Sequence, residues 1–171
     1  MPCHCGRAMV ILLIGLSTLF TPAAADGPHP KLGNWRLIRT VNPRGGPDAV
    51  SMSHTADMTR SDLELAGAML RCGEKSLEIV IVVVTPFPPH ARPGVIIGAD
   101  GKEWPFDARV VPPGAELLLP AEAMSLAAGP WQSARELTVK VTSPEQSFGG
   151  VIPIEGLAAA LATLAANCPA G

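Results

Sequence analysis

The chain has 171 residues, with 13 Lys and Arg against 15 Asp and Glu and a net charge of −2. This length is typical of one ordinary domain, which can bury enough apolar surface to fold without a metal. Charges of both signs are interspersed, which excludes a basic nucleic-acid-binding surface and a Lys/Arg cluster for an anionic membrane. We therefore expect no nucleic-acid partner, and since no cofactor-binding motif is present we expect no cofactor.

The first 25 residues are typical of a secretory signal peptide. Arg7 gives a positive start, an uncharged apolar run extends from Ala8 to Phe20, and Ala23 and Ala25 form a small-residue cleavage pattern. The apolar run is shorter than the ~20 residues that cross a bilayer as a helix, which disfavours an uncleaved anchor. We predict cleavage after Ala25, a mature domain of residues 26–171 without a membrane span, and a periplasmic or secreted location.

Two cysteines remain in the predicted mature chain. Cys3 and Cys5 leave with the signal peptide, so Cys72 and Cys168 are left. An even number of cysteines in an exported protein predicts a disulfide. The chain-entropy model gives a closed loop of roughly 100 residues on the order of 4–5 kcal/mol of stabilisation. The alternative is a reactive thiol at Cys72, beside the cation of Arg71.

Short strand patterns dominate the predicted mature chain, and segments rich in Pro, Gly, Asn and Asp separate them. Leu77–Val84 is a nearly continuous β-branched run, which predicts a central strand covered on both faces. Asp100-Gly101 predicts a tight hairpin turn. The predicted strands are Trp35–Val41, Ala49–Thr55, Leu63–Cys72, Leu77–Val84, Val95–Gly98, Trp104–Val111, Glu116–Leu119, Leu137–Thr142 and Phe148–Ile154.

Two helices are predicted near the end of the chain. Pro120–Ala128 has a proline in its first turn and a glycine after its end. A C-terminal helix over about 156–167 carries Leu157, Leu161 and Leu164 on one stripe, so it should dock on a sheet. We therefore predict a mainly β (α+β) domain, an antiparallel β-sandwich or barrel-like fold with a docked C-terminal α-helix.

Common enzyme motifs are missing from the sequence, including the nucleophile elbow, the phosphate-binding loop and the dinucleotide fingerprint. The histidines His29, His54 and His90 are scattered and lack metal-ligand spacing. We therefore predict no catalytic residue and no metal site.

The densest charge cluster contains Asp57, Arg60, Asp62 and Glu64. The carboxylate oxygens of Asp57, Asp62 and Glu64 could bind calcium, but the spacing is not that of an EF-hand loop. A solvated turn with internal ion pairs is the favoured interpretation. The alternative is an extracytoplasmic hydrolase or lyase that uses these carboxylates together with Arg60 or Arg71.

The proline-rich segment Thr85–Pro93 carries Phe87, Pro88 and Pro89. A preordered polyproline segment loses little entropy on binding, so these three residues form a candidate interaction loop. The favoured alternative is a rigid connector in which Phe87 packs against a sheet.

Several features of the second half of the chain occur together. An apolar strand ends in Arg-Cys, a late strand contains Phe, and Gly-Leu precedes an alanine-rich helix that ends at Cys. The residues are Arg71, Cys72, Phe148, Gly156, Leu157, Ala160, Leu164 and Cys168. In these features the chain resembles bacterial periplasmic proteins associated with type VI secretion and, more loosely, the invasion-associated locus B family.

The resemblance covers about residues 35–168. The secretion-associated family favours Lys or Arg, then Glu and Thr, shortly after the first Cys, whereas this chain has Gly73-Glu74-Lys75-Ser76. The resemblance implies a periplasmic, non-catalytic accessory module with a protein partner in the cell envelope, and it implies no catalytic residue. A small-ligand carrier that uses the barrel interior is a further alternative.

Overall fold

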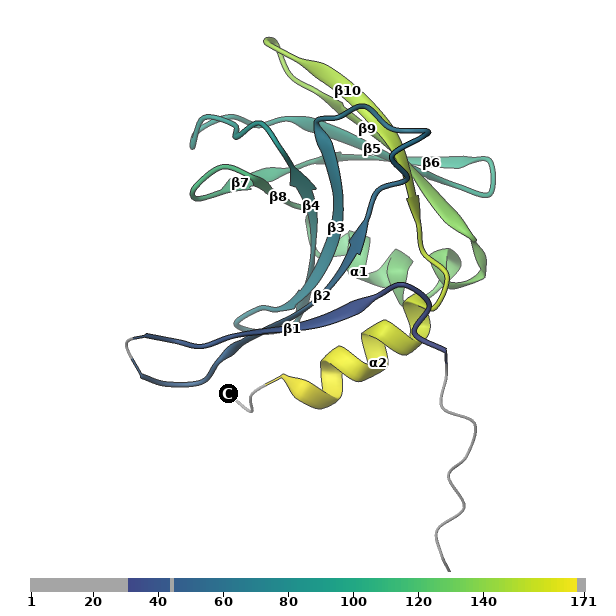
Figure 1. The fold of residues 1–171 in the computed structure, drawn as a ribbon. Helices are drawn as coiled ribbons and strands as arrows, with labels where there is room; N and C mark the ends of the chain where they lie inside the picture. Colours follow the sequence, from purple (N-terminus) through teal and green to yellow (C-terminus); the bar gives the residue numbers. More distant parts are fainter. Residues whose placement is uncertain (1–30, 44, 169–171) are drawn as a thin grey trace, which may run out of the picture.

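A computed structural model describes residues 31–43 and 45–168. The predicted signal peptide lies outside these residues. Two antiparallel sheets of six and four strands enclose one apolar core, and a C-terminal helix packs against the larger sheet (Figure 1). The predicted mainly β fold with a docked terminal helix is confirmed.

The larger sheet, sheet A, has the strand order β1-β2-β3-β4-β8-β7, and the smaller, sheet B, has the order β10-β9-β5-β6. The strands of sheet A are β1 Arg36–Thr40, β2 Ala49–Thr55, β3 Leu65–Cys72, β4 Leu77–Val83, β7 Arg109–Val111 and β8 Glu116–Leu118. Those of sheet B are β5 Gly94–Ala99, β6 Lys102–Asp107, β9 Glu136–Thr142 and β10 Ser147–Pro153. The helices are α1 Glu122–Ala127, the 3-10 turn η1 Pro130–Ser133 and α2 Leu157–Asn167.

The core follows from side-chain alternation along the strands. In β9, Leu137, Val139 and Val141 are buried, whereas the residues between and after them are exposed. Because successive side chains of a strand point to opposite faces, this pattern places one face of β9 inside and the other in water. Fully buried side chains from both sheets, such as Met52 and Ile97, meet in this core.

The predicted hairpin turn is confirmed, but the strand that follows it is shorter than predicted. Asp100 and Gly101 both have positive φ, at 48° and 75°, as a two-residue type I′ turn requires. The predicted strand Trp104–Val111 is divided, because the chain crosses from sheet B to sheet A at Ala108. The Ala108 side chain is fully buried, and its N–H donates to the Pro93 carbonyl at 3.0 Å.

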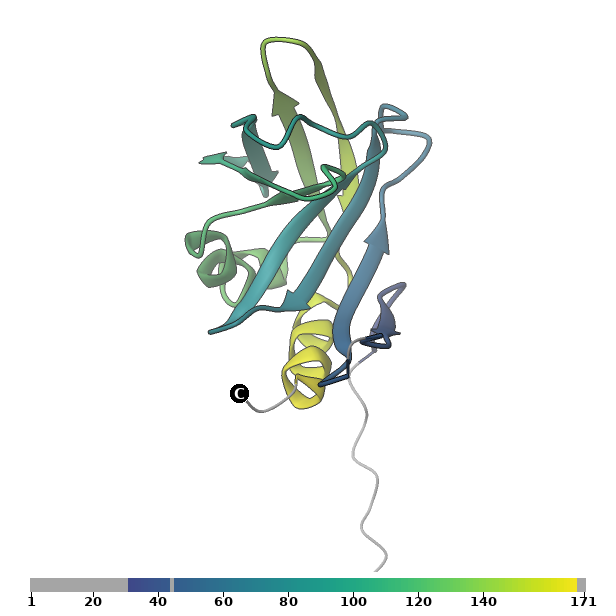
Figure 2. The same ribbon diagram turned by 90° about the vertical axis from the view of Figure 1, so that its left-hand side faces the viewer.

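Strand β4 is central, as predicted, but no second layer formed by the described part of the chain covers its outer face. It pairs with β3 and β8, and Ile79 and Ile81 point into the core. Figure 2 looks onto the outer face of sheet A, where no helix lies in front of β3 or β4. Val80 and Val82 alternate with the core residues and therefore face this outer side.

Helix α2 rests on β2 and β3, with Leu157, Leu161 and Leu164 buried beneath it. The predicted disulfide joins Cys72, the last residue of β3, to Cys168, which follows α2, with a Cα–Cα distance of 5.6 Å. This distance is usual for a disulfide. No helix within residues 31–43 and 45–168 has the length and apolar character that a membrane crossing requires.

We expect Cys168→Ser to lower the free energy of unfolding by about 2–5 kcal/mol, because the bridge closes a loop with a sequence separation of 96 residues. The check is a denaturant titration of the variant beside the oxidised and reduced parent protein. Reduction of the parent should reproduce the effect of the substitution. Equal stability of all three samples would contradict a stabilising bridge.

Candidate functional site

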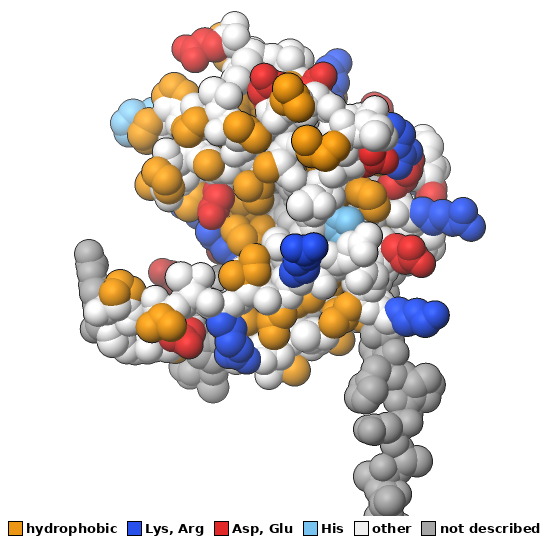
Figure 3. Space-filling view, viewed as in Figure 1, with side chains coloured by type: hydrophobic (Ala, Val, Ile, Leu, Met, Phe, Trp, Pro, Cys, Tyr) orange, Lys and Arg blue, Asp and Glu red, His pale blue; other side chains and the backbone are white. Residues whose placement is uncertain are grey.

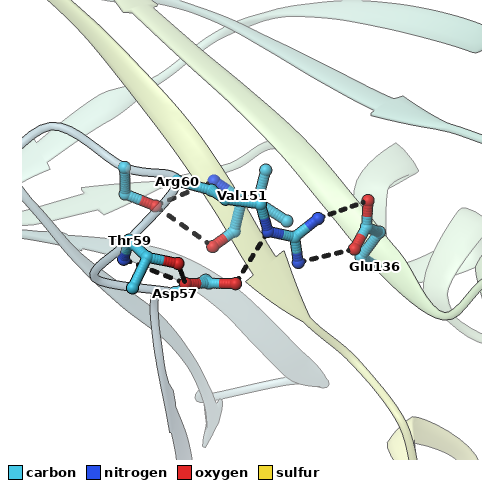
Figure 4. Close-up of polar contacts among 6 residues, drawn as sticks. Asp57, Thr59, Arg60, Glu136 and Val151 are labelled. Carbon is cyan, nitrogen blue, oxygen red and sulfur yellow. Dashed lines mark hydrogen bonds and ion pairs between the residues drawn. The ribbon is translucent and has the colours of Figure 1, made fainter.

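The charge cluster predicted from the sequence lies in the loop between β2 and β3 (Figure 4). The carboxylate of Asp57 accepts the Thr59 backbone N–H at 3.0 Å, the Thr59 hydroxyl at 2.7 Å and the Arg60 Nε–H at 2.7 Å. Arg60 also reaches across to sheet B, where its guanidinium pairs with Glu136 at 2.8 Å. Arg60 therefore links two carboxylates that lie far apart in the sequence.

The same loop is hydrogen-bonded along the outer edge of β10. The Asp57 N–H donates to the Val151 carbonyl at 2.8 Å, and the Ser61 hydroxyl accepts the Val151 N–H at 2.9 Å. Two residues earlier on β10, Gly149 exchanges bonds of 2.8 and 2.9 Å with the side chain and backbone of Asp62. The loop thus satisfies backbone groups that a free sheet edge would leave unpaired.

A glycine allows this close contact. A Cβ on Gly150 would lie 2.2 Å from the Ser61 hydroxyl oxygen and 2.7 Å from the Ser61 Cα. The absence of a side chain at Gly150 therefore lets the β2–β3 loop pack closely against β10.

These contacts set the electrostatics of the cluster. Hydrogen bonds from the Thr59 hydroxyl and then from Arg60 hold the pKa of Asp57 at about 2, well below its usual range. Glu136 first, and Asp57 second, raise the pKa of Arg60. Asp57 therefore stays ionised at neutral pH, with both oxygens occupied, so it cannot donate a proton as a general acid.

The structure separates the two arginines of the hydrolase hypothesis. Arg60 belongs to the β2–β3 loop, whereas Arg71 lies on β3 and pairs with Glu78 and Glu116, each at 2.8 Å. Glu64, the fourth residue of the predicted cluster, contributes its backbone carbonyl, which accepts the Val84 N–H. The residues are thus engaged in two distinct polar clusters and do not converge on one site.

The proline-rich loop exposes two of its three candidate contact residues to solvent. Pro88 and Pro89 are exposed, whereas Phe87 is 3% exposed and packs against Phe148 with ring centroids 6.3 Å apart. The Phe87 N–H donates to the Gly114 carbonyl at 3.0 Å. Phe87 therefore anchors the loop to the core and is not available to a partner.

The outer face of sheet A carries an apolar centre under a charged bridge. The guanidinium of Arg71 on β3 reaches Glu116 on β8, and β4 lies between these strands. Arg71 is opposite Glu78 of β4, and Glu116 is opposite Val82. The ion pair between Arg71 and Glu116 therefore crosses β4 above Val80, which lies between these two positions and is fully buried. Figure 3 shows hydrophobic side chains gathered in the hollow between the β1–β2 and β7–β8 ends of the sheet.

Strand β1 forms one edge of sheet A. Among the strands of residues 31–43 and 45–168, only β1 has every residue exposed. Leu37 is 41% exposed, Ile38 42%, and Val41, which follows the strand, 74%. The strand was expected from the sequence, whereas its exposure was not. The signal was the loose alternation of residues 35–41, which defines no single buried face.

Within residues 31–43 and 45–168, no group of three or more His, Cys, Asp and Glu side chains could hold a metal ion. No family model matches the chain, and no curated protein or solved structure shows a significant match to it. The resemblance to the two periplasmic families therefore stays a prediction that rests on the sequence features alone.

We expect the Asp57 interactions to stabilise the fold above about pH 4 and to be lost as the pH falls through about 2, because the pKa of Asp57 is lowered on folding. Asp57→Asn should therefore be less stable than the parent at pH 6, and the difference should shrink towards pH 2. The measurement is urea unfolding across this range. Asp100→Asn, in the exposed hairpin turn, is the control, and a constant Asp57→Asn deficit at every pH would refute the assignment.

We expect Gly150→Ala to destabilise the protein by about 1–3 kcal/mol or more, because the added methyl group overlaps Ser61. Gly94→Ala is the matched control, since its Cβ would meet only the Thr142 carbonyl oxygen at 3.8 Å. Thermal unfolding of both variants tests this expectation. Equal melting temperatures for the two variants would show that the β2–β3 loop can move away from the added methyl group without loss of stability.

Proposed function

We propose that this protein is an exported, periplasmic interaction module that acts through protein contacts rather than catalysis. The signal-peptide pattern supports export, and the Cys72–Cys168 disulfide is consistent with an oxidising extracytoplasmic compartment. The resemblance stated above suggests a partner in the cell envelope, such as a component of a secretion machine. The contact surface that we propose is the β1 edge, defined as Arg36–Thr40 with the adjoining Val41.

The exposed apolar character of the β1 edge is the observation that carries this proposal. An edge strand presents unpaired backbone groups, and a partner strand can add to it. Leu37 and Ile38 point to opposite faces, so a strand that pairs there could contact one of them on each side. The adjacent hollow on the outer face of sheet A would extend the contact area.

The other sheet edges are less suited to strand addition. The β2–β3 loop occupies the edge of β10. Pro105 interrupts β6, and β7 is three residues long. Proline, short strands and covering loops are the usual ways in which proteins prevent edge pairing. β1 is longer than β7, contains no proline, unlike β6, and has exposed apolar side chains.

The charges of the β1 edge favour a different protein over a second copy of this chain. Arg36 and Arg39 carry the only charges of the strand, and Arg39 donates to Asn167 of α2. Pairing of two β1 strands would bring these arginines together, and like charges on neighbouring strands are destabilising. A neutral or acidic strand avoids this cost.

The two alternatives find less support in the structure. The carboxylates of a hydrolase site would need free oxygens, but Asp57 and Asp62 are engaged with the backbone and with neighbouring side chains. A carrier would need internal space, but large side chains such as Met52, Leu70 and Trp131 fill the region between the sheets.

Site-specific photo-crosslinking in the native host tests the proposal. A photoreactive residue in place of Ile38 should yield repeated crosslinks to one envelope protein, identified by mass spectrometry. The same residue in place of Lys140, which is exposed on β9 of sheet B, should not. Equal labelling from both positions, or none from position 38 in exported and folded protein, would contradict the β1 edge as the contact surface.

A further inference from the structure

A groove of about 700 Å³ runs between strand β6 and helix α1. Trp104, Phe106 and Leu126 provide much of its apolar lining, and all three are partly exposed. It lies on sheet B and α1, away from the residues of the β1 edge. Partly exposed aromatic side chains beside a concave surface are typical of binding sites.

The two aromatic rings are held in place from below. The Trp131 ring, 1% exposed, lies in η1 and meets Trp104 and Phe106 at centroid distances of 6.0 and 6.5 Å. Both contacts have the edge-to-face geometry that aromatic pairs prefer. The groove is therefore formed before any ligand arrives, which reduces the entropy lost on binding.

The backbone of β6 does not suit an added strand at this groove. In a two-residue hairpin the residues that flank the turn form a hydrogen-bonded pair, here Ala99 and Lys102. By alternation the backbone groups of Pro105 point away from β5. Proline has no N–H, so this point of the free edge offers a carbonyl acceptor and no donor. A strand added here would lack one backbone hydrogen bond, which gives side-chain contacts a larger share in recognition.

The charges that line the groove have one sign. Asp107 and Glu122 are its only charged lining residues, and neither has an ion-pair partner among residues 31–43 and 45–168. This differs from Asp57, Glu78, Glu116 and Glu136, which are all paired with an arginine. Aromatic faces and carboxylates both attract cations, so the groove is complementary to a positive charge.

We propose that this groove binds a short basic segment of a partner protein, in which Lys or Arg residues alternate with apolar residues. The apolar side chains contact Phe106 and Leu126, and the cations contact the carboxylates of Asp107 and Glu122. A peptide segment fits better than a small amine, because the groove is open to solvent along its length, whereas small-molecule sites enclose most of their ligand. This site is independent of the β1 edge.

The test uses the mature protein and an acetylated, amidated pentapeptide, Leu-Arg-Leu-Arg-Leu. NMR titration should shift the amide signals of Trp104, Asp107 and Leu126, and the affinity should fall as salt rises, because exposed charges are screened. The matched peptide with Glu in place of Arg should leave these signals unchanged. Shifts that centre on another surface, or equal binding of the two peptides, would overturn the proposal.

The variant Asp107→Asn/Glu122→Gln tests the role of the carboxylates. Both residues are exposed, so the fold should tolerate the change, and we expect binding to weaken about threefold to tenfold. Glu103→Gln is the matched control, since Glu103 is an exposed carboxylate of the same strand that does not line the groove. An equal loss in both variants would indicate a general charge effect and would overturn the proposal.

Two further measurements distinguish a basic peptide segment from a small amine and from a second copy of this chain as the ligand of the groove. Arginine amide at the peptide's concentration should bind far more weakly than the pentapeptide; equal binding would indicate a small-amine site instead. Sedimentation should show no self-association that depends on Asp107 and Glu122. Self-association that the double variant abolishes would make a second copy the occupant and overturn the assignment to another protein. None of these results depends on the β1 edge.

Discussion

The main constraint on this fold comes from the backbone groups at the edges of its two sheets, which either find partners within the chain or stay open to other chains. An open antiparallel sheet leaves a row of N–H and C=O groups at each edge, and these groups can pair with other chains. At β10 the β2–β3 loop supplies the partners, through Asp57, Ser61 and Asp62. The missing side chain of Gly150 also helps, because Ser61 occupies the space that a Cβ atom would fill. The charged cluster in this loop is therefore best understood as part of an edge cover.

A second constraint concerns the outer face of sheet A, which no helix or strand of residues 31–43 and 45–168 covers. Apolar side chains on an uncovered face would normally remain in contact with water. Here one arginine reaches over the central strand to Glu116, and Val80 beneath it is fully buried. The long aliphatic stem of Arg71 contributes apolar cover while its charged end stays paired. The bridge thus takes part of the role that a covering layer has in other sandwiches.

Features of the fold that depend on local sequence patterns could be predicted, whereas those that depend on contacts between distant residues could not. The strand Ala49–Thr55 matches the prediction to the residue and the helix Leu157–Asn167 begins within one residue of it, because each segment has a clear hydrophobic period of its own. The division of Trp104–Val111 could not be predicted, since an alternating run carries no information about which sheet it joins. The cover of β10 was equally hidden, because its hydrogen bonds join residues far apart in the sequence: Asp62 and Gly149 are 87 residues apart, and Ser61 and Val151 are 90 apart. The alternation of Trp104 and Phe106 was visible, but α1, which completes the groove, comes beside them only through the fold.

Charge pairing distinguishes the parts of the surface that support the fold from those that remain open to partners. Arg60 and Arg71 each hold two carboxylates, and these four ion pairs secure a loop and a sheet face. The β1 edge and the groove differ, because the first carries arginines and the second carries unpaired carboxylates. A short segment whose charges are all of one sign cannot be complementary to both surfaces. If both surfaces are used, they must therefore engage two different segments, so a module of this kind would connect two partners or two regions of one partner.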